Sequence, residues 1–374
     1  MKSVLIVRRA AALLTFASGI AACSGETTGT GPATPLPFLS GITTDPGIAL
    51  SVSSSRNALF MVQTGAPATR VELPLGASST VTPVDLSVRG TKAIIPLGNA
   101  ASVALVDLTN ARIERFFTFP SGNATGSAWL DDSTAIVCNQ SNNYCGRIRT
   151  GRTANTIPDT VKVAEFPSSV IVVAGRVFVV SSYLDANYAQ IGNGIVTELS
   201  ATSNRVLRTF TVGPNPQYAA ASADGTKLYV TNSGDYGANN GSLSVINLTT
   251  NTVELPISGF GDFPGPISID TKGRAFISSF NFGTIVWDVA TRTFLRGPAN
   301  AVCAKRTNAS GASVCRGASD AMVAPNGNLY QSFFGSSSQS LPSYLFVYDG
   351  TTLALKDSIA MPLGTNNIRV QSFK

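Results

Sequence analysis

The chain has 374 residues, of which 44% are hydrophobic and only 13% charged, and it carries a formal charge of +6 without any histidine. The lack of histidine excludes Ser-His-Asp and Cys-His triads, His-containing zinc or iron sites, and haem ligation by His. The 34 glycines and 20 prolines favour a β-rich globule with many turns.

Residues 1–22 predict a signal peptide, because basic residues precede a short apolar region and an Ala-Ala pair before Cys23. The four residues IAAC that end at Cys23 resemble a bacterial lipobox, in which a peptidase cuts before the Cys and its thiol is acylated. The residue after Cys23 is Ser24 rather than Asp, and in this the chain resembles lipoproteins that a Gram-negative cell transports to the outer membrane. We therefore expect a lipid-anchored protein of the bacterial cell envelope, periplasmic or surface-exposed; an ordinary signal peptide with a chance Cys is the alternative.

Residues 23–40 read as a flexible tether, and residues 41–374 as the folded part. The leader holds three basic residues and no acid, which leaves +3 on the mature chain. Only Arg147, Arg149 and Arg152 approach a basic stripe, and we interpret them as exposed ends of one strand and its turn. No nucleic-acid partner is predicted.

A strand-like segment recurs seven times along the folded part, at intervals of 41 to 49 residues and a last one of 61. The sixth residues of the copies are Gln63, Asp107, Thr150, Glu198, Asn247, Asp288 and Asp349. A hairpin precedes most copies, with its turn at Gly90, Gly225, Gly273 or Gly327, where glycine adopts positive φ without steric penalty. Four short strands repeated seven times predict an all-β, seven-bladed β-propeller with four antiparallel strands per blade.

The clearest copy, ADGTKLYVTN, contains Tyr229-Val230-Thr231-Asn232, and the repeat resembles the YVTN family of bacterial β-propellers. The resemblance covers roughly residues 42 to 374 and is weakest in blades one and three. It implies the fold; the family hosts binding proteins and enzymes alike.

Two strands compete to close the ring. The C-terminal segment IRVQSFK follows a loop, PLGTNN, similar to those before other first strands, so it is the favoured innermost strand of blade one. In the alternative, GIALSV is innermost and ALFMVQ is second.

The remaining four cysteines of this exported chain are expected to form disulfides, with proximity favouring Cys138 with Cys145 and Cys303 with Cys315. The second pair ties off an insertion between blades six and seven, which explains the long last interval.

No catalytic, metal or cofactor site is predicted. The recurring acids are interpreted as turn-capping groups rather than a glycosidase pair, and so are Asp131 and Asp132 in a hairpin turn. The loop GDYGANNG is interpreted as a hairpin loop rather than a cation site.

Loops that join second to third strands emerge on one face of a propeller, because strands alternate in direction. In this chain these loops are rich in aromatic, amide and small residues, the mixture used in recognition surfaces. The candidate ligand-binding residues are Tyr144, Tyr183, Asp185, Tyr188, Asn232, Asp235, Tyr236, Phe280, Phe282, Phe333 and Phe334. Mutual packing of these rings as a plug in the channel is the alternative.

The sequence thus predicts a monomeric envelope lipoprotein that binds a glycan, a peptide or an envelope protein on the aromatic loop face. The alternatives are a His-free hydrolase or lyase that uses Asp and Glu on the same face, and a structural scaffold.

Overall fold

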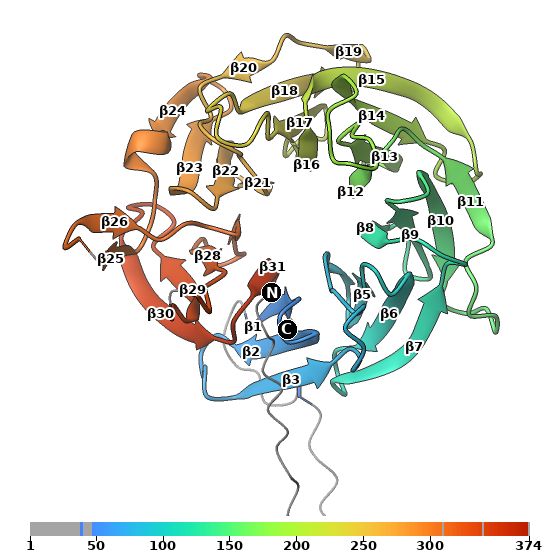
Figure 1. Ribbon diagram of the computed structural model, residues 1–374, viewed down its shortest axis with the longest axis horizontal. Helices are drawn as coiled ribbons and strands as arrows, with labels where there is room; N and C mark the ends of the chain where they lie inside the picture. Colours follow the sequence, from blue (N-terminus) through green and yellow to red (C-terminus); the bar gives the residue numbers. More distant parts are fainter. Residues whose placement is uncertain (1–37, 40–46, 309, 339, 373–374) are drawn as a thin grey trace, which may run out of the picture. The chain divides into compact units, whose positions relative to one another are not determined.

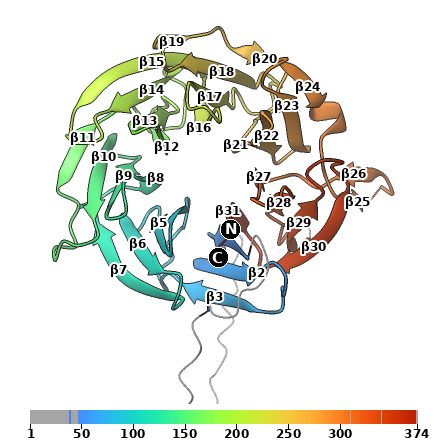
Figure 2. The same ribbon diagram turned by 180° about the vertical axis from the view of Figure 1, so that it is seen from behind.

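The computed structural model describes residues 38–39, 47–308, 310–338 and 340–372, all within one compact unit, Pro37–Lys374. The predicted signal peptide and nearly all of the predicted tether lie outside the described residues. The described chain forms seven antiparallel sheets arranged as blades around a central opening (Figure 1; Figure 2), so the predicted seven-bladed β-propeller is confirmed. No helix in this part of the chain is long and apolar enough to span a bilayer.

The strands of each blade follow one another from the channel outward. Blade 1 comprises β31 (Thr365–Gln371), β1 (Ile48–Ser53), β2 (Ala58–Gln63) and β3 (Arg70–Pro74). Blade 2 comprises β4 (Ser87–Arg89), β5 (Lys92–Pro96), β6 (Ser102–Asp107) and β7 (Arg112–Thr118). Blade 3 comprises β8 (Ala124–Trp129), β9 (Thr134–Asn139), β10 (Tyr144–Arg149) and β11 (Asp159–Lys162). Blade 4 comprises β12 (Pro167–Val173), β13 (Arg176–Ser181), β14 (Asn193–Leu199) and β15 (Val206–Pro214).

The remaining blades have the same order. Blade 5 comprises β16 (Pro216–Ala221), β17 (Lys227–Asn232), β18 (Ser242–Asn247) and β19 (Thr252–Val253), with β20 (Ile257–Ser258) also paired to β18. Blade 6 comprises β21 (Ile267–Ile269), β22 (Arg274–Ser279), β23 (Gly283–Asp288) and β24 (Thr293–Arg296). Blade 7 comprises β27 (Asp320–Val323), β28 (Leu329–Phe333), β29 (Ser343–Tyr348) and β30 (Leu355–Met361). The insertion between blades 6 and 7 carries η1 (Pro298–Asn300) and a hairpin of β25 (Lys305–Thr307) and β26 (Ser313–Cys315).

The hydrophobic core lies between the blades rather than within one central mass. Successive side chains of a strand point to opposite faces of its sheet, so the middle strands are buried on both sides. In β17, Leu228 and Val230 pack with blade 4 whereas Tyr229 packs with blade 6. The aromatic and β-branched run of the YVTN-like copy is therefore the second strand of blade 5, sealed between two neighbours.

The C-terminal strand β31 closes the ring, as the favoured interpretation of the sequence predicted. It pairs antiparallel with β1, with Ile48 opposite Gln371 and Ala49 opposite Val370. Ile368 and Val370 are buried in the cluster between blades 1 and 7. Phe38 and Leu39, at the end of the predicted tether, pack against the cluster between blades 1 and 2.

The recurring acids mostly cap turns, as predicted. The Asp288 carboxylate accepts the backbone N–H of Thr291 at 2.7 Å, which lowers the pKa of Asp288, and Asp107 and Asp349 accept equivalent bonds. Glu198 departs from this interpretation. Its carboxylate is buried and forms ion pairs with Arg176 and Arg208 of the same blade, so Glu198 does not cap a turn.

Both predicted disulfides are present. Cys138 and Cys145 lie directly opposite each other in β9 and β10, and Cys303 bonds Cys315 at the base of the insertion. Each therefore fixes a loop on the same side of the ring as the second-to-third strand loops.

Arg147 corrects the expectation that it is an exposed strand end. Its side chain is buried and donates to the backbone carbonyls of Ser200, Ala201 and Ser203 in the neighbouring blade. Arg149 and Arg152 both pair with Asp159, so the three arginines do not form a free basic stripe.

Candidate functional site

The face that we call the loop face carries the second-to-third strand loops and the connections from one blade to the next. Because adjacent strands are antiparallel, every innermost strand, the closing β31 included, begins just after a connection from the preceding blade. Residues early in the innermost strands therefore lie near the loop-face mouth of the central channel.

A cavity of about 260 Å³ occupies this end of the channel, and all seven blades contribute to its lining. Asn123, just before β8, and Gln140, just after β9, belong to loop-face connections and bring the cavity to that face. The deeper lining comes from the innermost strands and includes Thr125, Ser127, Ser168, Ser169, Tyr218, Asp320, Asn367 and Arg369. These strands place polar side chains where the middle strands place apolar ones.

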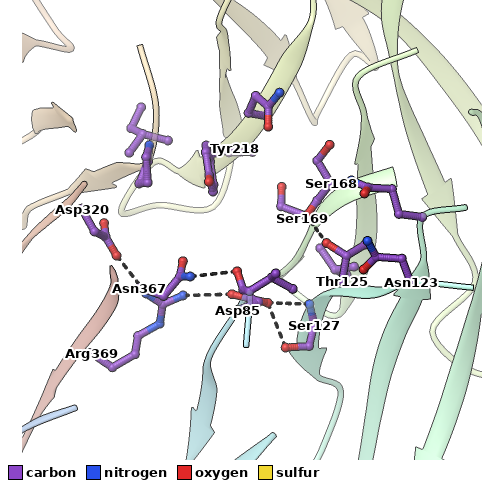
Figure 3. A pocket seen from close by; sticks show the side chains of 17 residues that line it. Asp85, Asn123, Thr125, Ser127, Ser168, Ser169, Tyr218, Asp320, Asn367 and Arg369 are labelled. Carbon is purple, nitrogen blue, oxygen red and sulfur yellow. Dashed lines mark hydrogen bonds and ion pairs between the residues drawn. The ribbon is translucent and has the colours of Figure 1, made fainter. Parts of the chain in front are cut away.

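Arg369 lies between two carboxylates on one side of the cavity (Figure 3). Its Nη2 is 3.8 Å from Asp85 Oδ1, and its Nη1 is 3.6 Å from Asp320 Oδ2. Asp85 also accepts the backbone N–H and the hydroxyl of Ser127, at 2.7 and 2.9 Å. One guanidinium shared by two acids leaves the cluster with a net charge of −1 when all three groups are ionised.

The carboxyl group of Asp320 is almost completely buried, and burial raises its pKa. The Arg369 cation and the backbone N–H groups of Ile368 and Ala321 oppose that shift, since they favour the ionised form. Burial raises the pKa of Tyr218 as well, with the charges of Asp320 and Asp85 adding to it. Tyr218 is therefore a neutral hydrogen-bonding phenol at physiological pH.

The rim of the loop face carries three edge-to-face pairs of aromatic rings. Ring centroids are 5.3 Å apart for Phe166 and Tyr188, 5.9 Å for Tyr236 and Phe263, and 6.2 Å for Phe280 and Phe334. Tyr188, Tyr236 and Phe280 remain 72%, 80% and 53% exposed, and they belong to blades 4, 5 and 6. The rings pair at the rim, and none of these three lines the channel cavity, so they do not plug it.

Much of this rim stands on strained backbone. Phe166, Tyr183, Tyr188 and Phe263 all have positive φ, between 52° and 64°. A bulky side chain in this left-handed region is a genuine outlier and costs of order 1 to 3 kcal/mol, a cost that proteins concentrate at functional sites.

Most of the predicted binding residues are either exposed on the loop face or partly buried beside it. Tyr188, Asp235, Tyr236 and Phe280 are exposed on the loop face, and Gln190 Nε2 donates to Asp235 Oδ1 at 2.8 Å, which ties the loops of blades 4 and 5 together. The side chain of Asp185 accepts the N–H groups of Asn187 and Ala189 and so shapes the Tyr188 loop. Tyr183, Phe282, Phe333 and Phe334 are partly buried.

Two further predicted residues, Asn232 and Tyr144, make contacts inside the fold. Asn232 is fully buried, and its amide donates to the hydroxyls of Ser242 and Ser244, so it cannot meet a ligand at the surface. Tyr144 packs edge-to-face on Phe119 and its hydroxyl accepts from Asn139. Asn232 therefore lies outside the candidate site, whereas Tyr144, half-buried like Tyr183 and Phe282, stays a prediction.

The sequence did not predict the channel cluster, which is formed by Asp85, Asp320 and Arg369, nor two of the aromatic rings at the rim. Phe166 and Phe263 each directly precede a proline in a blade-to-blade connection, as Asn215 does in the connection to blade 5, and all three have positive φ. This repeated X-Pro position was the available signal. Among the described residues, no group of three or more acids and cysteines is placed to hold a metal ion.

Comparison with known proteins supports the fold. No family model and no curated protein sequence matches the chain. Among solved structures it is similar to hydrazine synthase of Kuenenia stuttgartiensis, with a TM-score of 0.59 and 16% identity over 85% of this chain and 98% of that one. It is also similar to the dihydro-heme d1 dehydrogenase NirN in complex with DHE, with a TM-score of 0.57 and 12% identity over 91% of this chain and 76% of that one. At these identities the likeness concerns the fold alone.

Proposed function

We propose that this chain is a lipid-anchored cell-envelope protein of the YVTN-like propeller kind, and that its loop face binds a glycan. The lipobox-like IAAC before residue 24 and the YVTN-like strand of blade 5 support the first part. The exposed aromatic rings of the rim carry the second, because a ring that stays 80% exposed gains little from folding. Two of the three rim pairs also include a residue with strained, positive-φ backbone.

The chemistry of the channel mouth favours a polyhydroxylated ligand. Asp85 and Asp320 offer acceptors, Arg369 and Asn367 offer donors, and the serine and threonine hydroxyls offer both. Aromatic rings at the rim supply flat apolar faces on which sugar rings stack. Concave sites that combine a few convergent polar groups with aromatic walls are the usual form of small-ligand sites.

Binding fits the cluster better than hydrolysis does. A His-free hydrolase needs one carboxyl group to give a proton and another to attack or activate water. In this cluster Asp85 and Asp320 are both within 4 Å of the same guanidinium, and each also accepts backbone N–H groups. Both acids therefore help to hold Arg369 in place, and their remaining lone pairs can accept hydrogen bonds from a bound ligand.

The test uses the mature protein on an array of bacterial and environmental glycans, with bound hits confirmed by calorimetry. We expect saturable binding of at least one glycan class, and a protein that binds peptides or envelope proteins but no glycan would contradict the assignment. Intact-mass analysis of the membrane fraction tests the anchor separately, because acylation of Cys23 adds a diacyl or triacyl increment.

A further inference from the structure

A second cavity of about 290 Å³ lies on the loop face between blades 6 and 7, beneath the disulfide-linked insertion. Its walls include Phe280 and Phe334, which form one of the aromatic rim pairs, and Leu341. Two arginines, Arg306 and Arg316, also line it. Its volume is at the lower end of the range typical of ligand sites, about 300 to 1,000 Å³.

The described part of the cavity wall carries positive charge and no carboxylate. Arg316 stacks on the rings of Phe333 and Tyr344, at 5.2 and 5.4 Å from their centroids, and its Nη1 is buried with no hydrogen-bond partner among the described residues. The described residues that line the cavity include no Asp or Glu. A buried guanidinium nitrogen without an acceptor costs free energy, which a bound anion would offset.

The cavity is held in shape from two sides. Cys303 and Cys315 close the base of the insertion, and the backbone N–H of Ala318 donates to Ser279 O at 2.7 Å. Gly317 packs so closely on the loop of blade 6 that a Cβ there would lie 1.8 Å from Phe280 O. Only glycine fits at position 317, and this close approach holds the neighbouring Arg316 against the aromatic rim.

We propose that this cavity binds the carboxylate of an acidic sugar, a uronate unit of the glycan. The inference rests on the proposed function for the polymer, while the anion site itself stands on the two arginines. A guanidinium presents paired N–H donors that match a planar carboxylate, and the neighbouring rings accept the apolar face of the sugar. The channel cluster, with its net negative charge, would then contact neutral units.

Calorimetry with a uronic-acid oligosaccharide and with a neutral oligosaccharide of the same length tests the proposal. We expect the wild type to bind the acidic oligosaccharide at least about tenfold more tightly, and Arg306→Gln and Arg316→Gln each to lose about tenfold or more for it alone. Arg316→Lys keeps the charge but not the fork and should lose affinity too. Arg205→Gln removes an exposed arginine from a turn on the opposite face and should change nothing.

Equal affinity for the two oligosaccharides, or equal losses in Arg205→Gln and Arg306→Gln, would overturn the inference while leaving glycan binding intact. A sulfated oligosaccharide that outcompetes the uronate would also overturn it. The arginine side-chain NMR signals titrated with free glucuronate separate the two proposals. Shifts confined to Arg306 and Arg316 support the anion site even where no polymer binds, whereas unshifted signals refute it.

Discussion

Replacing Tyr236 with Ala should abolish much of the ligand affinity while leaving the fold almost untouched. Because Tyr236 is 80% exposed, only about a fifth of its surface is buried. With ~200 Å² for an aromatic side chain and ~25 cal/mol per Å², this burial is worth about 1 kcal/mol. The edge contact with Phe263 adds about 0.5 kcal/mol more.

The matched control is Phe260→Ala. Phe260 is fully buried and packs on Trp287 and Phe294, with centroids 6.0 and 4.9 Å away. Its loss should cost about 3 to 5 kcal/mol. Thermal unfolding should therefore show a decrease of a few degrees for Tyr236→Ala and a much larger one for Phe260→Ala.

The same two variants are then titrated with the best glycan from the array. We expect Tyr236→Ala to bind about tenfold more weakly, and Tyr188→Ala combined with it to weaken binding further. A Tyr236→Ala protein as unstable as Phe260→Ala, or one that binds with wild-type affinity, would refute the reasoning that the ring serves a ligand.

Three further predictions concern groups that hold the site in place. Arg147→Met should lower the free energy of unfolding, measured in urea, by about 2 to 4 kcal/mol, because it removes charged hydrogen bonds to the next blade. Arg149→Met breaks a half-exposed ion pair and should lower it by less than about 1 kcal/mol. Similar values for the two variants would contradict this assignment. Replacing both Cys138 and Cys145 with Ala should lower the free energy of unfolding by about 2 to 3 kcal/mol. This loss should exceed that for the partly exposed Cys303 and Cys315 pair, although the second pair closes the longer loop, because removing two fully buried sulfurs also leaves a cavity. The reverse order by calorimetry would be a contradiction. The pKa of Asp320, measured by carboxyl ¹³C NMR, should lie above 3.8, because burial opposes ionisation, and it should rise further in Arg369→Gln, because the Arg369 cation favours ionisation. Since the folded pKa exceeds the unfolded one, ionised Asp320 lowers the stability of the fold above its folded pKa, and this loss disappears as the pH falls through that pKa. A normal or lowered pKa would disprove the account.

The propeller was predictable because its signals are local and repeat. Turn glycines such as Gly225 recur in most blades, and buried runs such as the one at Tyr229 recur along the chain and are buried between two neighbours. The closing strand was predictable too, because the loop before β31 resembles those before other first strands.

The channel site was not predictable in this way. Asp85, Asp320 and Arg369 are far apart in sequence and meet only because the ring brings the innermost strands together. Arg147 was misjudged for a related reason, since its acceptors come from residues more than 50 positions later. Local patterns report which way a side chain faces within its blade, but they do not report what the next blade offers it.

Hydrogen–deuterium exchange with and without a saturating glycan tests the central claim most directly. The account predicts slower exchange in the loop-face segments 182–193, 232–241 and 279–283. The turns 200–205, 248–251 and 289–292 on the opposite face serve as internal controls and should not change. Protection confined to those turns, or no protection anywhere under saturating ligand, would contradict a binding site on the loop face.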